Sequence, residues 1–452
     1  MIHDTLAPGS VEVLPQQLIR TVVTRGLRRE QAKRARRRAL VDGRTLVVGL
    51  DLARQKQAAS FVVPGGEIVG RLRFECAPQN LTCVLERAEA LRVQHQLARV
   101  VIAMEPAGHY WMLAAEAFER AGMPYVLVHS LSVKRSREET RYTPEKSDPR
   151  DADLIGILAQ EGKFTEARLP ACAERAALQA LAREYLLVRK ASAAERTRLG
   201  NFWERLLPEF GTLFRESTGT TALAVSTALG PLSEIAALTP SRWLARVRKA
   251  AAGERILRPR ATALLPLLQA AHADPHRRSG EGMPWRIRLA AQRRRFLEHQ
   301  KEALRAEILR RYAGYEESLY LDSIPGSEPF YNALVLALVG DFHLYDDPRA
   351  IVKLAGSEVN EFASGDYSGR SRISHRGRSA LRAAAYQQAR LLVRRNDDFR
   401  ERFFALLHRT RGRRLAELQC YVAVMDSYLR TAHVLVTQRV FYRPRLEREE
   451  VH

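Results

Sequence analysis

The pattern of apolar and polar residues is strand-like at first and then becomes helical. Short runs rich in β-branched residues and bounded by turn residues are typical of strands. They occur in RTLVVGLDLA (44–53), QAASFVVPGGEIVGRLRFEC (57–76), ARVVIAMEP (98–106) and PYVLVHS (124–130). Two stretches with helical periodicity, 81–96 and 109–122, alternate with the later runs. Three strands in a meander, followed by alternating helix and strand, predict an α/β layered domain over residues 44–164. We expect it to end with the helix that begins near Asp148.

The strand pattern disappears between residues 165 and 320. Two long, Arg-rich segments, 174–207 and 285–319, have helical periodicity and predict long antiparallel helices or a coiled coil. Beyond Leu321, a turn leads into an apolar helix that stops at Gly340, and a polar loop then leads into a basic helix. We therefore expect a mainly helical domain over 321–440 and a tail at 441–452. We expect residues 1–43 to form a basic arm or a short helix that is appended to these domains.

The charge balance indicates a polyanionic partner. The 452 residues have a formal net charge of +22, although apolar residues at 46% and charged residues at 27% are ordinary values for a folded protein. Binding of such a cationic protein to a phosphate backbone is favoured, because it releases counterions from the nucleic acid. Two dense clusters are candidates for the contact, although any one could be only a solvated face: Arg34, Arg36, Arg37 and Arg38, and Arg409, Arg411, Arg413 and Arg414.

The cysteine pattern and the hydropathy of the sequence indicate where in the cell the protein is located. The four cysteines form neither a CxxC pair nor a disulfide-like framework, which favours a reducing environment. The sequence contains no apolar run of about 18 residues and no signal-peptide core in its first thirty residues. We therefore expect a cytoplasmic protein without a membrane partner.

Four carboxylates stand where elements of the first domain begin or end. Asp51 follows LVVGL and Glu105 follows RVVIAM, while Asp148 and Asp151 open the helix EKSDPRDADLIGIL. The last two are three residues apart and share a helix face. They could be helix caps only, since acids stabilise helix N-termini. Acids that end apolar strands require a cation, however, and hard divalent ions take carboxylate ligands. The pattern indicates a magnesium-type site that assists phosphoryl transfer. Asp153, off this face, is expected to be solvent-exposed.

The loop FASGDYSGRSRISHRG is the second candidate for chemistry. Glycines allow the backbone to approach phosphate, and Arg370, Arg372, His375 and Arg376 can clamp it. An activated serine hydroxyl can act as a nucleophile. The loop could equally bind phosphate without covalent chemistry, and its composition does not choose among its serines, which are Ser364, Ser368, Ser371 and Ser374.

With these motifs together, the chain resembles the DEDD-type insertion-sequence transposases, which are bridge-RNA-guided serine recombinases with a RuvC-like (RNase H-like) N-terminal domain. The resemblance covers about residues 44–440. It rests on VVGLDLA, AMEPAG and the run KSDPRDA (146–152), and on IPG, Gly356, Ser364-Gly365, ISHRG (373–377) and Leu381-Arg382. It implies that the four acids named above bind Mg²⁺ or Mn²⁺ and that Ser364 is the nucleophile.

The resemblance also implies partners and further site residues. The partners are DNA, as element ends and target, a guide non-coding RNA and further copies of the chain in a dimer or tetramer. The residues implied to contact nucleic acid are Lys146, Arg370, Arg372, His375, Arg376 and Arg382. Three places depart from the family pattern: Gly326-Ser327-Glu328 replaces Gly-Ile-Gly, Gly356-Ser357-Glu358-Val359 replaces Gly-Leu-x-Pro, and His375 replaces lysine.

The sequence is also compatible with two other functions. A RuvC-like hydrolytic nuclease would use metal-activated water and need no serine. A non-catalytic nucleic-acid-binding scaffold would use the basic helices alone, with the acids as caps.

Overall fold

The structure is a computed structural model that divides into two compact units, Met1–Leu169 and Pro170–His452. The residues that it describes are 25–54, 56–75, 78–106, 110–140, 148–166, 172–274, 282–360, 363–364, 367–368, 372–409 and 416–444. No helix within these ranges is long and apolar enough to cross a membrane.

The first unit is built on a six-stranded sheet with the strand order β3-β2-β1-β4-β5-β6. The strands β1 to β3 form an antiparallel meander, β4 and β5 extend it in parallel with β1, and β6 is antiparallel to β5. Their bounds are β1 Thr45–Asp51, β2 Lys56–Val62, β3 Ile68–Glu75, β4 Arg99–Met104, β5 Tyr125–Leu127 and β6 Thr165–Glu166.

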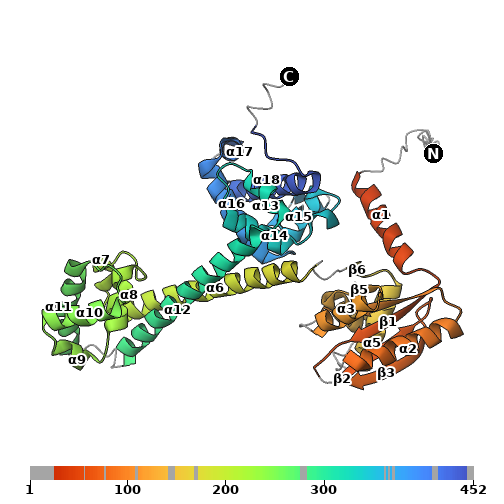
Figure 1. Cartoon of the computed structure of the whole chain (residues 1–452), viewed down its shortest axis with the longest axis horizontal. Helices are drawn as coiled ribbons and strands as arrows, with labels where there is room; N and C mark the ends of the chain where they lie inside the picture. Colours follow the sequence, from red (N-terminus) through yellow and green to blue (C-terminus); the bar gives the residue numbers. More distant parts are fainter. Residues whose placement is uncertain are drawn as a thin grey trace, which may run out of the picture. The chain divides into compact units, whose positions relative to one another are not determined.

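Helices cover both faces of this sheet (Figure 1). Alternate residues of β1 point to opposite faces, so that Leu46 and Val48 pack beneath α2 and α3, whereas Val47 packs beneath α4 and α5. The helices are α1 Arg25–Leu40, α2 Pro78–Gln94, α3 Tyr110–Arg120, α4 Ser130–Thr140 and α5 Asp148–Gln160. The predicted α/β layered fold is confirmed, including a final helix that begins at Asp148, and it is the arrangement expected of a RuvC-like domain.

The second unit is mainly helical. Its longest helices, α6 and α12, lie side by side (Figure 1). They are antiparallel, because Ser192 of α6 bonds to Glu298 of α12 while Glu195 pairs with Arg293. One end of this pair joins a small helical bundle around Trp203 and Trp243. The bounds are α6 Ala173–Leu206, α7 Phe210–Leu213, α8 Thr220–Ala228, α9 Leu232–Ala236, α10 Pro240–Ala250, α11 Arg258–Ala273 and α12 Gly282–Tyr312.

The other end of the pair packs into the largest core of the chain, which surrounds the apolar helix α14. The predicted stop of that helix at Gly340 is confirmed. The helices here are α13 Glu316–Asp322, α14 Pro329–Val339, η2 Phe342–Leu344, α15 Pro348–Ala355, α16 Ser379–Arg395, α17 Asp397–Arg409 and α18 Ala416–Gln438. Four short strands lie between α15 and α16: β7 Val359–Asn360, β8 Ala363–Ser364, β9 Tyr367–Ser368 and β10 Arg372–Ile373.

Candidate active site

Two of the predicted acids lie at the same edge of the sheet. The strands β1 and β4 are parallel neighbours, and Leu50 is paired with Met104. Asp51 is the last residue of β1 and Glu105 directly follows β4, so their backbones lie side by side at the carboxyl edge, where neighbouring strands are about 4.8 Å apart. Both side chains are half-buried. The register of one strand pair therefore brings together two carboxylates that are 54 residues apart in the sequence.

The helix α5 crosses β1 in direct backbone contact. A Cβ atom added at Gly49 would lie 2.2 Å from the Ala152 carbonyl oxygen and 2.5 Å from the Gly156 amide nitrogen. At the far end of the helix, the Gln160 side-chain amide donates to the Thr45 carbonyl oxygen at 2.8 Å. The helix therefore runs antiparallel to β1, and its first turn lies beyond Gly49 on the side of Asp51.

This geometry brings the start of α5 to the edge that carries the other two acids. Asp148 is the first residue of α5, and its side chain lies outside the described residues. Asp151 is 3% exposed. Its Oδ1 accepts two hydrogen bonds from Arg137 of α4, at 3.1 Å from Nε and 2.7 Å from Nη2. The structure thus gives Asp151 a cationic partner that the sequence analysis did not identify.

The prediction for Asp153 was wrong. Its side chain is only 14% exposed, and its two carboxylate oxygens accept hydrogen bonds from Arg71 of β3 at 3.0 to 3.2 Å. The reason is geometric, because α5 lies across the sheet and its residue 153 faces the edge strand rather than water. Asp153 serves to attach α5 to the sheet.

The side chains that could bind a divalent ion at this edge are carboxylates that come from β1, α5 and the residue after β4. Among the residues with described side chains, no three of His, Cys, Asp and Glu are close enough together to hold a metal ion. The donors are nevertheless carboxylates alone, which is the chemistry that Mg²⁺ and Mn²⁺ require. The backbones of β1, β4 and α5 converge at the same edge. The residues fit such an ion by chemical type, and Asp151 would have to exchange Arg137 for it.

Ser364 lies in the second unit, in a two-residue strand. Its backbone in β8 pairs with Tyr367 of β9 in a tight antiparallel hairpin. The side chain of Ser364 lies outside the described residues, as do all of Arg370 and Lys146. The backbone of Arg372 is described, and it pairs with Asn360. The serine is therefore located in the fold, but its hydroxyl is not.

The two ends of the serine loop are held together at their base. The Ser374 amide donates to the Glu358 carbonyl oxygen at 2.8 Å, and the His375 amide donates to that of Gly356 at 3.0 Å. Gly356 has a left-handed backbone with φ of +70°, and a Cβ atom added there would lie 2.7 Å from the Gly377 amide nitrogen. Only glycine fits such a close approach, so both positions are needed to close the loop.

The cations near this base have different environments. The side chains of His375 and Arg376, which were predicted to contact nucleic acid, are exposed. Arg382 is half-buried, and its Nη1 donates to the Ala355 carbonyl oxygen at 2.7 Å. Arg382 thus has a structural role at the end of α15, whatever it also contacts.

A polar pair that the sequence analysis missed joins the buried Ser357, just before the loop, to the half-buried Asp426. Ser357 is 1% exposed, and its Oγ donates to Asp426 Oδ1 of α18 at 2.5 Å. Burial raises the pKa of the Asp426 carboxyl to about 6, and the hydrogen bond from Ser357 partly offsets this. No local sequence signal links two residues so far apart in the chain.

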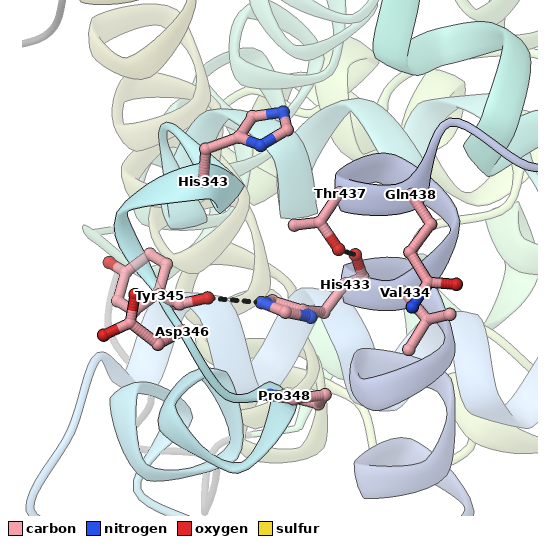
Figure 2. A pocket seen from close by; sticks show the side chains of 8 residues that line it. All are labelled: His343, Tyr345, Asp346, Pro348, His433, Val434, Thr437 and Gln438. Atoms are coloured by element: carbon pink, nitrogen blue, oxygen red, sulfur yellow. Dashed lines mark hydrogen bonds between the residues drawn. The ribbon is translucent and has the colours of Figure 1, made fainter.

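A separate pocket of about 300 Å³ lies between α18 and the segment that precedes α15, and Figure 2 shows its lining. His433 of α18 points across it, and its Nε2 is 2.6 Å from the Tyr345 carbonyl oxygen. None of the predicted site residues lines this pocket. Its contacts attach α18 to the neighbouring segment.

Comparison with known families identifies the two parts that carry the acids and the serine. A model of DEDD transposases of the IS110 type, described as Transposase, matches residues 48–211. A second model, described as Transposase IS116/IS110/IS902 family, matches residues 318–403.

The chain belongs to the IS110 family of DEDD transposases.

The first match spans Asp51, Glu105, Asp148 and Asp151, and the second spans Ser364. Membership in the IS110 family supports a transposase function that acts on DNA. DEDD transposase domains typically use divalent metals. No curated protein matches the chain.

Proposed function

We propose that this IS110-family transposase cuts and rejoins DNA by attack of the Ser364 hydroxyl on a DNA phosphate, assisted by a divalent metal at Asp51, Glu105, Asp148 and Asp151. The observation that supports the metal site most strongly is the register of β1 and β4, which makes Asp51 and Glu105 neighbours beside the first turn of α5. A bound divalent ion would stabilise charge on the oxygens around phosphorus.

In this mechanism the serine supplies the attacking atom. A bond forms between the Ser364 oxygen and phosphorus, and one phosphorus–oxygen bond of the DNA backbone breaks. The serine loses its proton, and the departing sugar oxygen gains one. The phosphate remains attached to the protein until a sugar hydroxyl attacks it, which releases Ser364 and rejoins a strand. We expect His375 and Arg376, whose side chains are exposed, to contact the DNA backbone.

The decisive experiment is trapping on a denaturing gel with labelled element-end DNA. The native protein is expected to give a covalent protein–DNA adduct, and Ser364→Ala is expected to give none while retaining DNA binding. Ser368→Ala, a matched change of the partner strand β9, should still form the adduct. An adduct of undiminished yield with Ser364→Ala would remove this serine from the mechanism.

The acids have their own test. Asp51→Asn and Asp148→Asn are expected to abolish strand exchange without weakening DNA binding, and EDTA should abolish exchange by the native protein. The exposed Glu116 of α3 provides a control, since Glu116→Gln should have no effect. An acid whose amide variant kept full activity would not be a metal ligand.

A hydrolytic nuclease is the second candidate function. The acids and Ser364 belong to different units of the chain, so the acids could activate water without the serine. In that case the trapping experiment would yield nicked DNA and no adduct, and Ser364→Ala would cut normally.

We also propose that a non-coding RNA guides the reaction and that the chain acts as a dimer or tetramer. The family resemblance and the net charge of +22 support these partners. Light scattering after gel filtration measures the oligomer, and sequencing of RNA that copurifies from cells carrying the whole element identifies the guide. A monomer free of RNA that still exchanges strands would contradict both.

A further inference from the structure

The helix α1 carries cations on every side. The sequence RGLRREQAKRARRRAL contains seven arginines, one lysine and one glutamate, which give it a net charge of +7 in sixteen residues. At 100° per residue the basic positions are spread around the whole axis, and no apolar stripe remains. This helix therefore lacks the apolar face that a helix needs to pack on a protein core.

The C-terminal end of α1 is attached to the first unit. Val41, the residue after the helix, is buried with Val47 of β1. The Arg37 guanidinium donates to the Gly162 carbonyl oxygen at 3.4 Å and lies 5.9 Å from the centre of the Phe164 ring. Other side chains of the helix, including Arg36 and Arg38, are exposed. The helix is thus fixed to the first unit at its C-terminal end, and Arg34, Arg36 and Arg38 have exposed side chains.

Such a helix repels itself. Like charges four residues apart destabilise a helix, and Arg25 and Arg29, Arg29 and Lys33, and Arg34 and Arg38 are spaced in this way. An isolated helix of sixteen residues is marginally stable in water even without this repulsion. A dense array of negative charge would remove the repulsion, so the sequence is suited to a polyanion rather than to water.

We propose that α1 binds the major groove of duplex DNA through the phosphates on both of its walls. A helix with side chains is about 10–12 Å wide, and the major groove of B-form DNA is about 12 Å wide. Cations around the whole helix match a groove with phosphates on two sides better than a single flat surface. The major groove of an RNA duplex is too narrow to admit such a helix. A membrane surface would require an apolar face, which α1 does not have.

This contact lies outside both family matches, which begin at residue 48 and residue 318. It does not depend on Ser364 or on the acids, so DNA binding by α1 and the proposed chemistry can fail separately.

The test compares full-length proteins on a 30-base-pair duplex by fluorescence anisotropy across a series of salt concentrations. The variant Arg34→Gln/Arg36→Gln/Arg38→Gln is expected to lose roughly ten-fold or more in affinity near 0.1 M salt. The plot of log affinity against log salt should become less steep by about 2 to 3, since each lost phosphate contact accounts for about 0.9. Lysine at the same three positions should retain most of the affinity.

A second triple variant distinguishes the loss of contacts made by α1 from the loss of net positive charge. Arg205, Arg215 and Arg255 are exposed in the helical bundle of the second unit, and changing them to glutamine removes the same charge. This control should lose clearly less affinity than the α1 variant. Hydrogen exchange of the amides of 27–38 should slow when duplex DNA is added to the native protein.

Three results would overturn the proposal. One is equal loss by the two triple variants, which would mean that only total charge matters. Another is a loss confined to an RNA duplex of the same length, which would assign α1 to RNA. Unchanged DNA affinity of the α1 variant would also overturn it.

Discussion

At the scale of single residues, the most informative contact is the ion pair between Arg137 and Asp151. The carboxylate is almost fully buried, and the guanidinium is 23% exposed. The arginine therefore sets a positive charge against a carboxylate that has little contact with water. Metal binding at Asp151 would require the guanidinium to move away, so the two cations compete for one carboxylate.

Arg137→Gln is expected to lower the free energy of unfolding in EDTA by about 1–3 kcal/mol, because a buried carboxylate loses its partner. Urea denaturation measures this change. Added Mg²⁺ should restore part of the loss if Asp151 is a ligand. Arg135→Gln, an exposed position on the same helix, should be neutral. Equal stability of the two variants in EDTA would show that the pair contributes nothing.

The Ser357–Asp426 pair leads to a prediction about pH. Ser357 stands at one of the three departures from the family pattern that the sequence resembles, and in the structure its hydroxyl donates to the Asp426 carboxyl of α18. Because burial raises the pKa of Asp426 from 3.8 to about 6, the folded state holds this proton more tightly than the unfolded state. The free energy of unfolding should therefore fall as pH rises from about 4 to about 6.

Asp426→Asn removes this dependence. Relative to the variant, the native protein should lose about 1–3 kcal/mol of unfolding free energy between pH 4 and pH 7. Thermal or urea unfolding at both pH values provides the measurement. Ser357→Ala should make the loss larger, because its hydrogen bond favours the charged carboxylate. A difference between the native protein and Asp426→Asn that is constant across pH would contradict this account.

At the scale of elements, the contact of α5 with β1 determines where the acids lie. The added methyl group of Gly49→Ala would meet backbone atoms of α5, and the helix would have to move away from the sheet. We expect a loss of stability of about 1–3 kcal/mol and a larger loss of strand exchange, since α5 carries Asp148 and Asp151. Chemical denaturation and an exchange assay measure the two effects.

Gly43→Ala is the matched control, because nothing lies within 4 Å of a Cβ atom added there. It should leave both stability and exchange unchanged. If Gly49→Ala matched this control in exchange, the position of α5 would not matter to the reaction.

The sequence predicted the elements of the first unit better than the contacts between them. Periodicity and β-branched runs were sufficient for β1 to β5, because β1 and β4 are buried on both faces. They did not predict β6 at Thr165–Glu166, because two residues are too few to show a strand pattern. The pairing of Asp151 with Arg137, and of Asp153 with Arg71, could not be predicted, since it depends on how α4 and α5 cross the sheet. Gly49 in a strand was the available signal of a close backbone approach.

The long helix pair shows the same limit. Its helical periodicity was evident, but its middle contains the buried Ser192 and Glu195 where a regular heptad would have apolar residues. Ser192 bonds to Glu298, which also pairs with Arg294. These contacts favour one register of the antiparallel pair. The irregular heptad pattern of these helices thus reflects polar contacts between α6 and α12.

At the scale of the whole molecule, the net charge of +22 governs encounters with nucleic acid. We expect duplex DNA of unrelated sequence to bind, and its affinity to fall about 10³-fold or more between 50 mM and 200 mM salt. Anisotropy titrations at several salt concentrations measure this dependence. An affinity that is insensitive to salt would mean that phosphate contacts contribute little, which would contradict the charge argument.

The closed base of the serine loop has a consequence for how this family can diversify. The segment begins and ends at two glycines in contact, Gly356 and Gly377. The surrounding helices hold these two points together, so the length of the segment between them has little influence on the entropy of closing it. Adding a few residues between them would lower the free energy of unfolding by only about a few tenths of a kcal/mol. Insertions and deletions within this segment can therefore be sampled by evolution, or by a protein engineer, while the helical scaffold keeps its fold.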